Sequence, residues 1–260
     1  MTEKKKESGW EALSSLAFAI GIALIFRSFA YEPFHIPSGS MLSTLYEGDY
    51  IFVSKFSYGY SRYSFPFNVP PFSGRILEAH KPARGDVVVF RLPPNPHVDY
   101  IKRIVGLPGD RIQVKQGRLY INDVPVEVTR RGDVSLPGRF GEEHLVARYD
   151  ETLPGGKTHV ILNEREGNLD PRTGLDSDNT GVYTVPEGDY FMMGDNRDNS
   201  QDSRYSAALG YDDAPGYVPE QNIVGRAVFV LGSFQGGVPA LALWRWPEAF
   251  RNDRWFTKVR

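Results

Sequence analysis

The chain has 260 residues, of which 41% are apolar and 24% are charged, and its formal net charge at pH 7 is −2. These proportions are ordinary for a folded protein of one large or two smaller domains, and the lack of a cationic excess argues against nucleic-acid binding. The chain contains no cysteine, which excludes a disulfide, a zinc–thiolate site and a cysteine nucleophile.

A basic, polar tail at residues 1–10 precedes a predicted transmembrane helix at residues 11–31. The apolar run is near the length that spans a bilayer. It carries a single charge, Arg27, near its far end, and Trp10 and Tyr31 bracket it as interfacial aromatic residues do. Lysines in the tail predict that this end is cytoplasmic and that the rest of the chain lies on the opposite side.

Two other interpretations of this run stay open. Ser28-Phe29-Ala30 places small residues where a secretory signal peptide is cut, and the uncharged core ends as early as Phe26. The run also fits a buried helix of a soluble protein, although the lysine flank and the aromatic brackets favour a membrane span.

Beyond the helix the sequence predicts a mainly β protein, because 26 Gly, 19 Pro, 16 Phe and 14 Tyr favour turns and strands. Apolar runs between turn signals predict strands at Phe34–Ile36, Tyr50–Val53, Val87–Phe90, Tyr100–Val105, Arg118–Ile121 and Ile223–Leu231. Residues 111–186 are more polar and have short strands. We expect them to form a second β domain inserted into a first one that comprises residues 32–110 and 187–260.

Two segments are unusually aromatic. Residues 56–74 interleave Tyr and Phe with Gly, Ser and Pro. This pattern fits either a long hairpin with an exposed aromatic face at the membrane interface or an irregular loop over the core. The segment from Leu243 to Phe256 combines Trp244, Trp246 and Trp255 with arginines, a composition suited to a membrane surface.

The segment Ile36-Pro37-Ser38-Gly39-Ser40-Met41 places two hydroxyl groups around a glycine shortly after the apolar run. A serine attacks a carbonyl only when one group takes its proton and another stabilises the developing oxyanion. By itself Ser-Gly-Ser is more typical of a turn, so the case for a nucleophile depends on finding those partners elsewhere in the chain.

The general base is the first partner to seek. The five histidines are scattered without metal-binding spacing, and a Ser-His-Asp triad stays open although no histidine is singled out. Lys102 is a second candidate, because strand alternation puts it on the face of Tyr100 and Ile104, where burial would lower its pKa from about 10.4. A solvent-facing lysine is the competing interpretation.

Two polar motifs follow. Gly194 to Arg204 alternates acidic and basic residues with two serines, and forms either a structural polar network or a shell that orients a catalytic group. Asp176 to Glu187 nearly matches a calcium-binding loop but has Thr180 at the fifth position and no following helix, so a plain turn is favoured and no metal site is predicted.

Together, Pro37–Met41, Arg84–Phe90, Tyr100–Asp110 and Gly194–Arg204 resemble, in order, the motifs of bacterial type I signal peptidases, the serine/lysine endopeptidases of peptidase family S26. The resemblance implies a signal-peptidase-like β catalytic domain with an inserted second β domain and no cofactor. The expected partners are the lipid bilayer and the signal peptides of exported preproteins, cut after small-x-small sites such as Ala-x-Ala, with no nucleic acid. The expected location is the bacterial inner (plasma) membrane, crossed once, with the catalytic domain on the periplasmic or extracytoplasmic side.

The resemblance also assigns roles. Ser40 would be the nucleophile and Lys102 the general base, while the Ser38 hydroxyl and the Ser40 N–H would form the oxyanion hole. Ser200 would orient Lys102, and Asp202 would form a supporting ion pair with Arg204. The residues implied to line the substrate cleft are Phe34, Ile36, Pro37, Asp99 and Ile101.

The sequence departs from the family pattern in three respects: it shows one N-terminal span where many members have two, the segment 206–219 is longer than usual, and no disulfide is possible. Two other functions were weighed. A self-cleaving Ser/Lys repressor would need a DNA-binding domain and a basic face, both of which are lacking. A non-enzymatic, membrane-tethered β module with structural polar motifs stays open.

Overall fold

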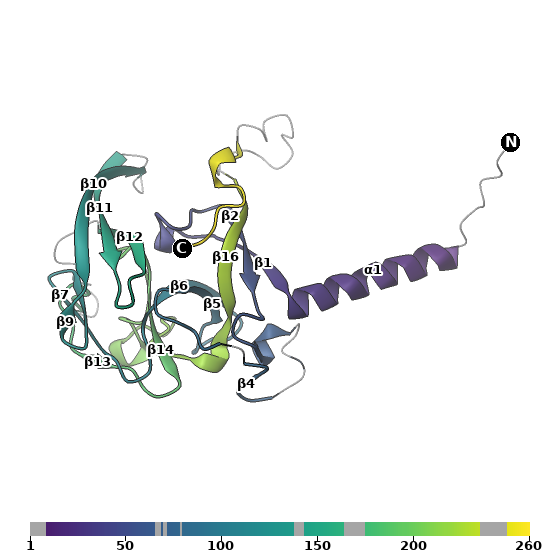
Figure 1. Cartoon of the computed structure of the whole chain (residues 1–260), viewed down its shortest axis with the longest axis horizontal. Coiled ribbons are helices and arrows are strands. Elements are labelled where there is room, and N and C mark those ends of the chain that lie inside the picture. The colour runs from purple at the N-terminus through teal and green to yellow at the C-terminus, as the bar shows by residue number, and fades with distance from the viewer. Residues whose placement is uncertain are drawn as a thin grey trace.

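One helix, α1 (Gly9–Phe29), projects away from a body built of β-strands (Figure 1). This computed structural model describes residues 9–65, 69, 72–78, 80–137, 143–163, 175–234 and 249–260. The lysine-bearing tail, Trp244 and Trp246 lie outside the described residues. The mainly β fold class predicted from the sequence is confirmed.

Helix α1 is apolar and uncovered on its sides. Leu16, Phe18 and Ile25 are each more than half exposed, as expected for a helix whose surroundings are lipid rather than protein. In the described part of the chain it is the one helix long and apolar enough to cross a membrane. The predicted end at Tyr31 is wrong: the helix stops at Phe29, because Tyr31 already pairs with Ser54 in the first strand.

The largest sheet has seven antiparallel strands in the order β1-β2-β16-β5-β6-β14-β15. In that order they are Tyr31–His35, Asp49–Ser54, Ile223–Ser233, Val87–Arg91, Asp99–Gly106, Asp189–Met193 and Val218–Pro219. The strands predicted in this sheet from the sequence are confirmed, with shifted ends.

Strand β5 shows why this sheet is stable on both faces. Val87 and Val89 join one buried apolar cluster, which includes Met41, and the alternating residues Val88 and Phe90 join another on the opposite face. Since successive strand side chains point to opposite faces, an uninterrupted apolar run is what a strand buried on both faces requires.

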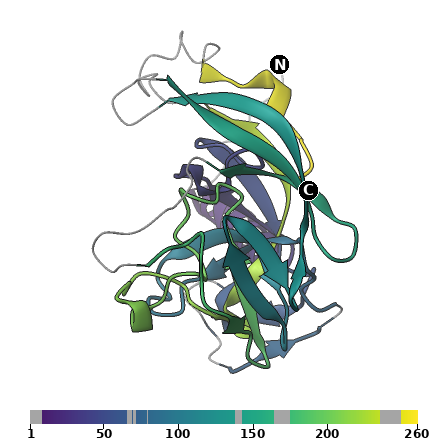
Figure 2. The ribbon, with the colours of Figure 1, turned by 90° about the vertical axis from the view of Figure 1, so that its left-hand side faces the viewer.

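Strands β7 to β13 lie between β6 and β14 in the sequence and form two further sheets, of order β10-β11-β12 and β13-β7-β8-β9. In chain order they are Arg111–Lys115, Arg118–Ile121, Val124–Pro125, Glu127–Pro137, Glu143–Thr152, Thr158–Asn163 and Tyr183–Thr184. They lie on the side of the body opposite α1 (Figure 1), and Figure 2 looks onto that side. The division of the chain at residues 111–186 stays a prediction.

These inserted strands share a core with the main sheet. Ile112 and Val114 of β7 belong to the same buried cluster as Val105 of β6 and Phe191 of β14. The insertion therefore packs directly against the strands that carry the candidate site, and the geometry of one constrains the other.

The aromatic segment from residue 56 onward is mostly irregular. Its described residues form a short pair of strands, β3 (Tyr60–Ser61) and β4 (Arg75–Ile76), and a short 3-10 helix, η2 (Arg62–Ser64). Tyr58 is 3% and Tyr63 is 4% exposed, so the hypothesis of an exposed aromatic face is wrong for these tyrosines, which cover the core instead. Tyr58 is held there by a 2.8 Å hydrogen bond to the Asp86 carboxylate. Phe67 lies outside the described residues.

Candidate active site

Ser40 lies in a short 3-10 helix, η1 (Gly39–Met41), a few residues beyond β1. The turn is fixed from within by Met41 and Leu45, which are completely buried. It is fixed from the other side by Asn196, whose backbone N–H donates to the Ser40 carbonyl (3.1 Å) and whose side-chain amide donates to the Gly39 carbonyl (3.2 Å). Asn196 was not singled out from the sequence.

Lys102 reaches Ser40 from strand β6. Its Nζ lies 2.7 Å from Ser40 Oγ and also donates to the Ile101 carbonyl (3.0 Å). The side chain is 4% exposed and lies over the ring of Tyr100, 5.3 Å from its centroid, so the predicted sharing of a face with Tyr100 holds. The solvent-facing alternative for Lys102 is wrong.

Burial lowers the pKa of Lys102 from 10.5 to about 8, although the charges of Asp202 and Asp195 oppose this shift and Arg204 adds to it. No carboxylate of the described residues is within ion-pair distance of its Nζ. An amine with this pKa is partly neutral near pH 7 and fully neutral only well above pH 8. Lys102 can therefore accept a proton from Ser40.

Ser38 and the Ser40 backbone carry the two hydrogen-bond donors that the resemblance assigns to an oxyanion hole. Ser38 is exposed, has an extended backbone, and its hydroxyl makes no capping bond to the short helix that follows. The Ser40 N–H has no backbone acceptor among the described residues. Donors of this kind, already oriented, are what a developing oxyanion requires.

Asp202 and Arg204 form a buried ion pair behind this site. Arg204 donates from Nε to one Asp202 oxygen and from Nη2 to the other, both at 2.9 Å. Burial by itself would raise the pKa of Asp202. Arg204, the Gly194 N–H and the Ser200 hydroxyl outweigh burial and lower it. The carboxylate is therefore charged, and its field acts on Lys102.

Ser200 is placed differently from its implied role. Its hydroxyl donates to Asp202 (2.8 Å), and the described residues show no direct hydrogen bond between Ser200 and Lys102. Gly194 explains how the loop comes so close: a Cβ there would lie 2.2 Å from Ser200 Oγ and 2.6 Å from the Ser40 carbonyl oxygen. Only glycine lets the chain pass between these two serines.

A second buried network, which sequence reasoning missed, joins strand β6 and the segment Gly194–Arg204 to the inserted sheet. Arg103 binds Asp195 through two hydrogen bonds of 2.8 and 2.7 Å. Arg197 pairs with Glu151 of β11, and burial, which would raise the Glu151 pKa, is outweighed by this pair, so that the pKa falls to about 2. His159 Nε2 of β12 lies between the two carboxylates, 3.3 Å from Glu151 and 3.7 Å from Asp195. No local pattern links these residues, because they come from distant parts of the chain.

The residues implied to line a substrate cleft differ in burial. Phe34 and Ile101 are partly buried against one core cluster, and Pro37 and Asp99 are exposed. Ile36 is only 2% exposed and belongs to the core, so its side chain lies below the surface rather than on it. The main chain of Ile36 is also occupied, by hydrogen bonds with Gly48 and Asp49.

Next to Lys102, strand β6 is paired with another described strand on one edge only. Its residues from Asp99 to Lys102 pair with β5, whereas pairing with β14 begins only at Arg103. A strand edge without a partner can accept an extended peptide through main-chain hydrogen bonds.

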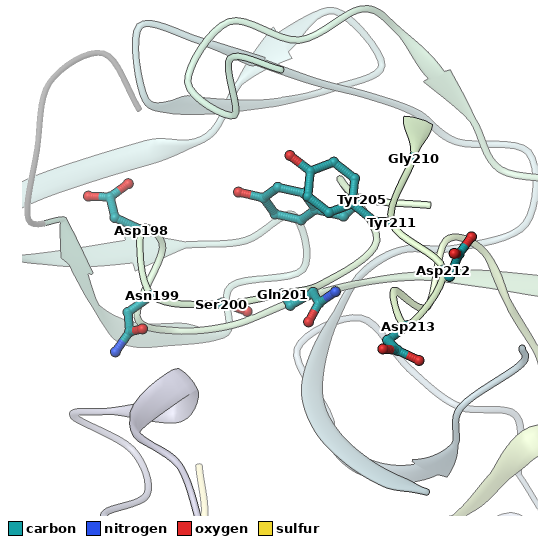
Figure 3. A pocket seen from close by; sticks show the side chains of 9 residues that line it. All are labelled: Asp198, Asn199, Ser200, Gln201, Tyr205, Gly210, Tyr211, Asp212 and Asp213. Atoms are coloured by element: carbon teal, nitrogen blue, oxygen red, sulfur yellow. The ribbon is translucent and has the colours of Figure 1, made fainter. Parts of the chain in front are cut away.

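A polar cavity of about 520 Å³ adjoins the site (Figure 3). It is lined by Asp198, Asn199, Ser200, Gln201, Tyr205, Gly210, Tyr211, Asp212 and Asp213. The Tyr205 and Tyr211 rings meet edge to face, with centroids 4.9 Å apart. The segment 206–219 therefore builds part of the surface beside Ser200.

The turn favoured for Asp176 to Glu187 has a local explanation. The Asp176 carboxylate accepts hydrogen bonds from the N–H groups of Asp178 and Asn179, as Asp side chains do in turns. Within the described ranges, no group of three or more His, Asp or Glu residues is arranged to hold a metal ion.

Three comparisons relate this geometry to known proteins. The sequence profile described as "Signal peptidase, peptidase S26" matches residues 9–232. The chain is 45% identical to signal peptidase I of Rickettsia typhi over 226 residues, covering 85% of this chain and 79% of the relative. It is 43% identical to that of Rickettsia felis over 241 residues, covering 88% and 80%. A crystal structure of a signal peptidase I from Enterococcus faecalis is 26% identical and covers 56% of this chain and 97% of its own, with a TM-score of 0.31.

Proposed function

The chain belongs to the signal peptidase family, peptidase S26, and from this premise we propose how its site cuts a preprotein. The protein is a serine endopeptidase that removes signal peptides, and its N-terminal apolar helix anchors it to a membrane. What we propose beyond this is the catalytic pair, the way the substrate binds and the orientation in the membrane.

The catalytic pair is Ser40 and Lys102. The observation that carries this assignment is the 2.7 Å contact between Ser40 Oγ and a lysine amine that burial keeps partly neutral. Neutral Lys102 takes the Ser40 proton while Oγ attacks the scissile carbonyl carbon, and the resulting ammonium returns that proton to the leaving amine. A water molecule then gives a proton to Lys102 and attacks the acyl-enzyme ester, and Lys102 passes this proton to Ser40 Oγ as the ester bond breaks.

The oxyanion formed in both steps is stabilised by the Ser38 hydroxyl and the Ser40 N–H. Asp202 and Arg204 hold the loop behind Lys102, and Ser200 fixes the Asp202 carboxylate. Since Asp202 is charged, it favours the ammonium form that Lys102 adopts after attack, and so stabilises the charge that develops in the transition state.

The signal peptide binds as an extended strand along the edge of β6 that does not pair with β5, from Asp99 to Lys102. Phe34 and Ile101 are partly buried against the core cluster that includes Met41. In this proposal they leave room for small side chains only, which accounts for cleavage after small-x-small sites such as Ala-x-Ala. Ile36 shapes this surface from below through its packing in the core.

The helix places the N-terminus on the cytoplasmic side of a bacterial plasma membrane and the β body on the other side, where exported preproteins emerge. The chain passes from the end of α1 at Phe29 to Ser40 within one short strand and turn. A site held this close to the bilayer meets membrane-held substrates at a high effective concentration.

The test is cleavage of a preprotein in detergent and in vesicles, with the new N-terminus determined by mass spectrometry. We expect Ser40→Ala and Lys102→Met each to abolish cleavage, and Ser38→Ala to lower kcat by about 10²-fold, the loss typical of one oxyanion donor. Ser43→Ala is the matched control, because Ser43 lies in the same turn region and its hydroxyl donates to the Val160 carbonyl.

The competing hypothesis, a non-enzymatic β module with structural polar motifs, makes the opposite forecast: Ser40→Ala would leave preprotein processing intact. Full activity in either Ser40→Ala or Lys102→Met, with the folded content and membrane association unchanged, would disprove the catalytic pair.

A further inference from the structure

The end of α1 is joined to the β body through three charged residues in a row. Arg27, in the last turn of the helix, donates to one oxygen of Glu32 from Nε (2.8 Å) and Nη2 (2.5 Å). Lys55, just after β2, approaches the other Glu32 oxygen at 2.8 Å. The Glu32 side chain is 9% exposed and that of Lys55 2%, whereas Arg27 is 58% exposed. A single buried carboxylate therefore links the helix to the sheet.

Uncharged contacts also connect the end of α1 to the β body. The Tyr60 hydroxyl donates to the Phe29 carbonyl at the end of the helix (2.7 Å), and the Lys55 N–H donates to the Ala30 carbonyl (3.2 Å). The Phe29 ring packs edge to face on Tyr60 and on Phe65, with centroids 5.5 Å apart in both pairs. Helix and sheet are thus connected without a free linker.

The joint is also connected to the site by short, paired structure. Glu32 and Phe34 lie on β1, where they pair with Val53 and Ile51 of β2. A rotation of α1 against the body would have to break these contacts or displace β1, from which the chain runs directly into the Ser40 turn. The orientation of α1 in Figure 1 is therefore tied to that of the site.

We propose that this junction, formed by Arg27, Phe29, Glu32, Lys55 and Tyr60, is a rigid clamp that holds the Ser40–Lys102 site at a fixed height and orientation above the bilayer. The clamp makes the enzyme selective for scissile bonds that a membrane-held signal peptide presents at that height. This inference rests on the proposed function, since it presumes that Ser40 and Lys102 cut preproteins at the membrane.

The free-energy cost of burying charges in the clamp indicates that the clamp does more than attach the helix to the β body. Burying Glu32 and Lys55 removes two charges from water, which their mutual attraction repays only in good geometry. A flexible linker would tether the body without that cost. What a flexible linker lacks is control of orientation, and orientation matters because misplacement of reacting groups by about 1 Å can cost about 10²-fold in rate.

The decisive variant is the double substitution Arg27→Gln and Tyr60→Phe, which removes both side-chain bonds to the helix end while Glu32 and Lys55 stay paired. Two substrates are compared: a preprotein inserted in vesicles and a short soluble peptide with the same cleavage site. We expect cleavage of the preprotein to fall by about three- to tenfold, with kcat/KM for the peptide unchanged. Arg131→Gln is the control, because Arg131 is 55% exposed and also pairs with a carboxylate, that of Asp150, but on the inserted sheet.

A series of preproteins tests the height itself. Spacers of different length are placed between the apolar segment and the cleavage site. The native enzyme should prefer one length, and the double variant should cut a broader range. A Lys55→Arg variant, which keeps the charge beside Glu32, should retain the native preference.

Because the chain has no cysteine, spin labels at Ser15→Cys on α1 and Val124→Cys on β9 measure the joint directly. The distance distribution between them should widen in the double variant. Equal loss on both substrates would mean general damage to the site, and unchanged preprotein cleavage or an unchanged distribution would mean that the joint does not control orientation; each of these overturns the clamp. A native enzyme that cuts neither substrate would instead overturn the proposed function.

Discussion

The molecule buries two lysines in different surroundings. Lys102 is 4% exposed and contacts a hydroxyl and a carbonyl, whereas Lys55 is 2% exposed and contacts the carboxylate of Glu32 at 2.8 Å. Burial lowers the pKa of both, but at Lys55 the charge of Glu32 and its hydrogen bond oppose the shift. Burial alone therefore does not produce a base: a lysine also needs to be kept away from direct carboxylate contact.

The carboxylates near Lys102 are engaged elsewhere. Asp202 is bound by Arg204, and Asp195 is bound by Arg103. Each arginine neutralises much of the charge that would otherwise hold a proton on Lys102. Glu32 differs because it contacts Lys55 directly, at 2.8 Å, and because its arginine partner, Arg27, is 58% exposed.

Replacing each lysine by methionine is expected to give the largest difference in activity between the two positions. We expect Lys102→Met to lower preprotein and peptide cleavage by more than about 10³-fold, since it removes the proton acceptor for Ser40. Lys55→Met should leave peptide cleavage within about twofold of the native rate, because no contact between Lys55 and the site is lost. Steady-state kinetics on the peptide measures both, and comparable losses in the two variants would contradict the division of roles.

The pH dependence of peptide cleavage is expected to follow Lys102 and not Lys55. Since neutral Lys102 is the active form and its pKa is about 8, kcat/KM should rise about tenfold per pH unit below pH 8 and level off above it. Lys55→Met should show the same profile. The measurement is peptide cleavage from pH 6 to pH 10, with stability checked at each end. A rate that is independent of pH through this range would rule out Lys102 as the titrating base.

Ser200→Ala tests the carboxylate behind the base. Without the 2.8 Å bond from Ser200, Asp202 loses one of its donors but keeps Arg204 and the Gly194 N–H. We expect kcat to fall about fivefold, equivalent to about one hydrogen bond, with KM for the peptide unchanged. Ser203→Ala is the matched control, because Ser203 is equally buried but accepts from the Met192 N–H. A loss near that of Lys102→Met would instead mean that Ser200 acts on the lysine directly.

The sequence allowed prediction of the parts of the site that local patterns encode. Strand alternation made Lys102 a candidate, the resemblance of the four motifs assigned roles to Ser40, Ser38 and Lys102, and the fold brings Ser40 and Lys102 into contact. Patterns of this kind cannot reveal partners that meet only in three dimensions, such as Asn196 with the Ser40 turn or Glu151 with Arg197. They also cannot distinguish a tyrosine that covers a core from one that faces a membrane, which is why the sequence left both environments open for Tyr58.

The same limit applies to the two lysines. Lys102 could be singled out from the sequence because it lies in an apolar strand that belongs to a recognisable motif. Lys55 could not, because the strand before it is equally apolar and its partner, Glu32, lies on an earlier strand. A lysine that acts as a base and a lysine that forms an ion pair differ in whether a carboxylate lies at contact distance. At Lys55 that contact results from the pairing of β1 with β2.

The smallest expected effect is a difference in the free energy of unfolding between variants of the two lysines. Between about pH 8 and 10.5 the unfolded chain binds more protons at Lys102 than the folded chain does. Burial of this amine therefore lowers the free energy of unfolding by its full amount below pH 8, and the effect disappears as the pH rises through 10.5. Lys102→Met should therefore be more stable than the native protein at pH 7, by up to about 3 kcal/mol, and the gain should vanish near pH 10.5. Lys55→Met should be less stable, by about 2 kcal/mol, because Glu32 loses a buried partner. Urea unfolding of the two variants at pH 7 and pH 10 measures these differences, and a loss of stability in Lys102→Met at pH 7 would contradict the penalty assigned to the buried Lys102 amine.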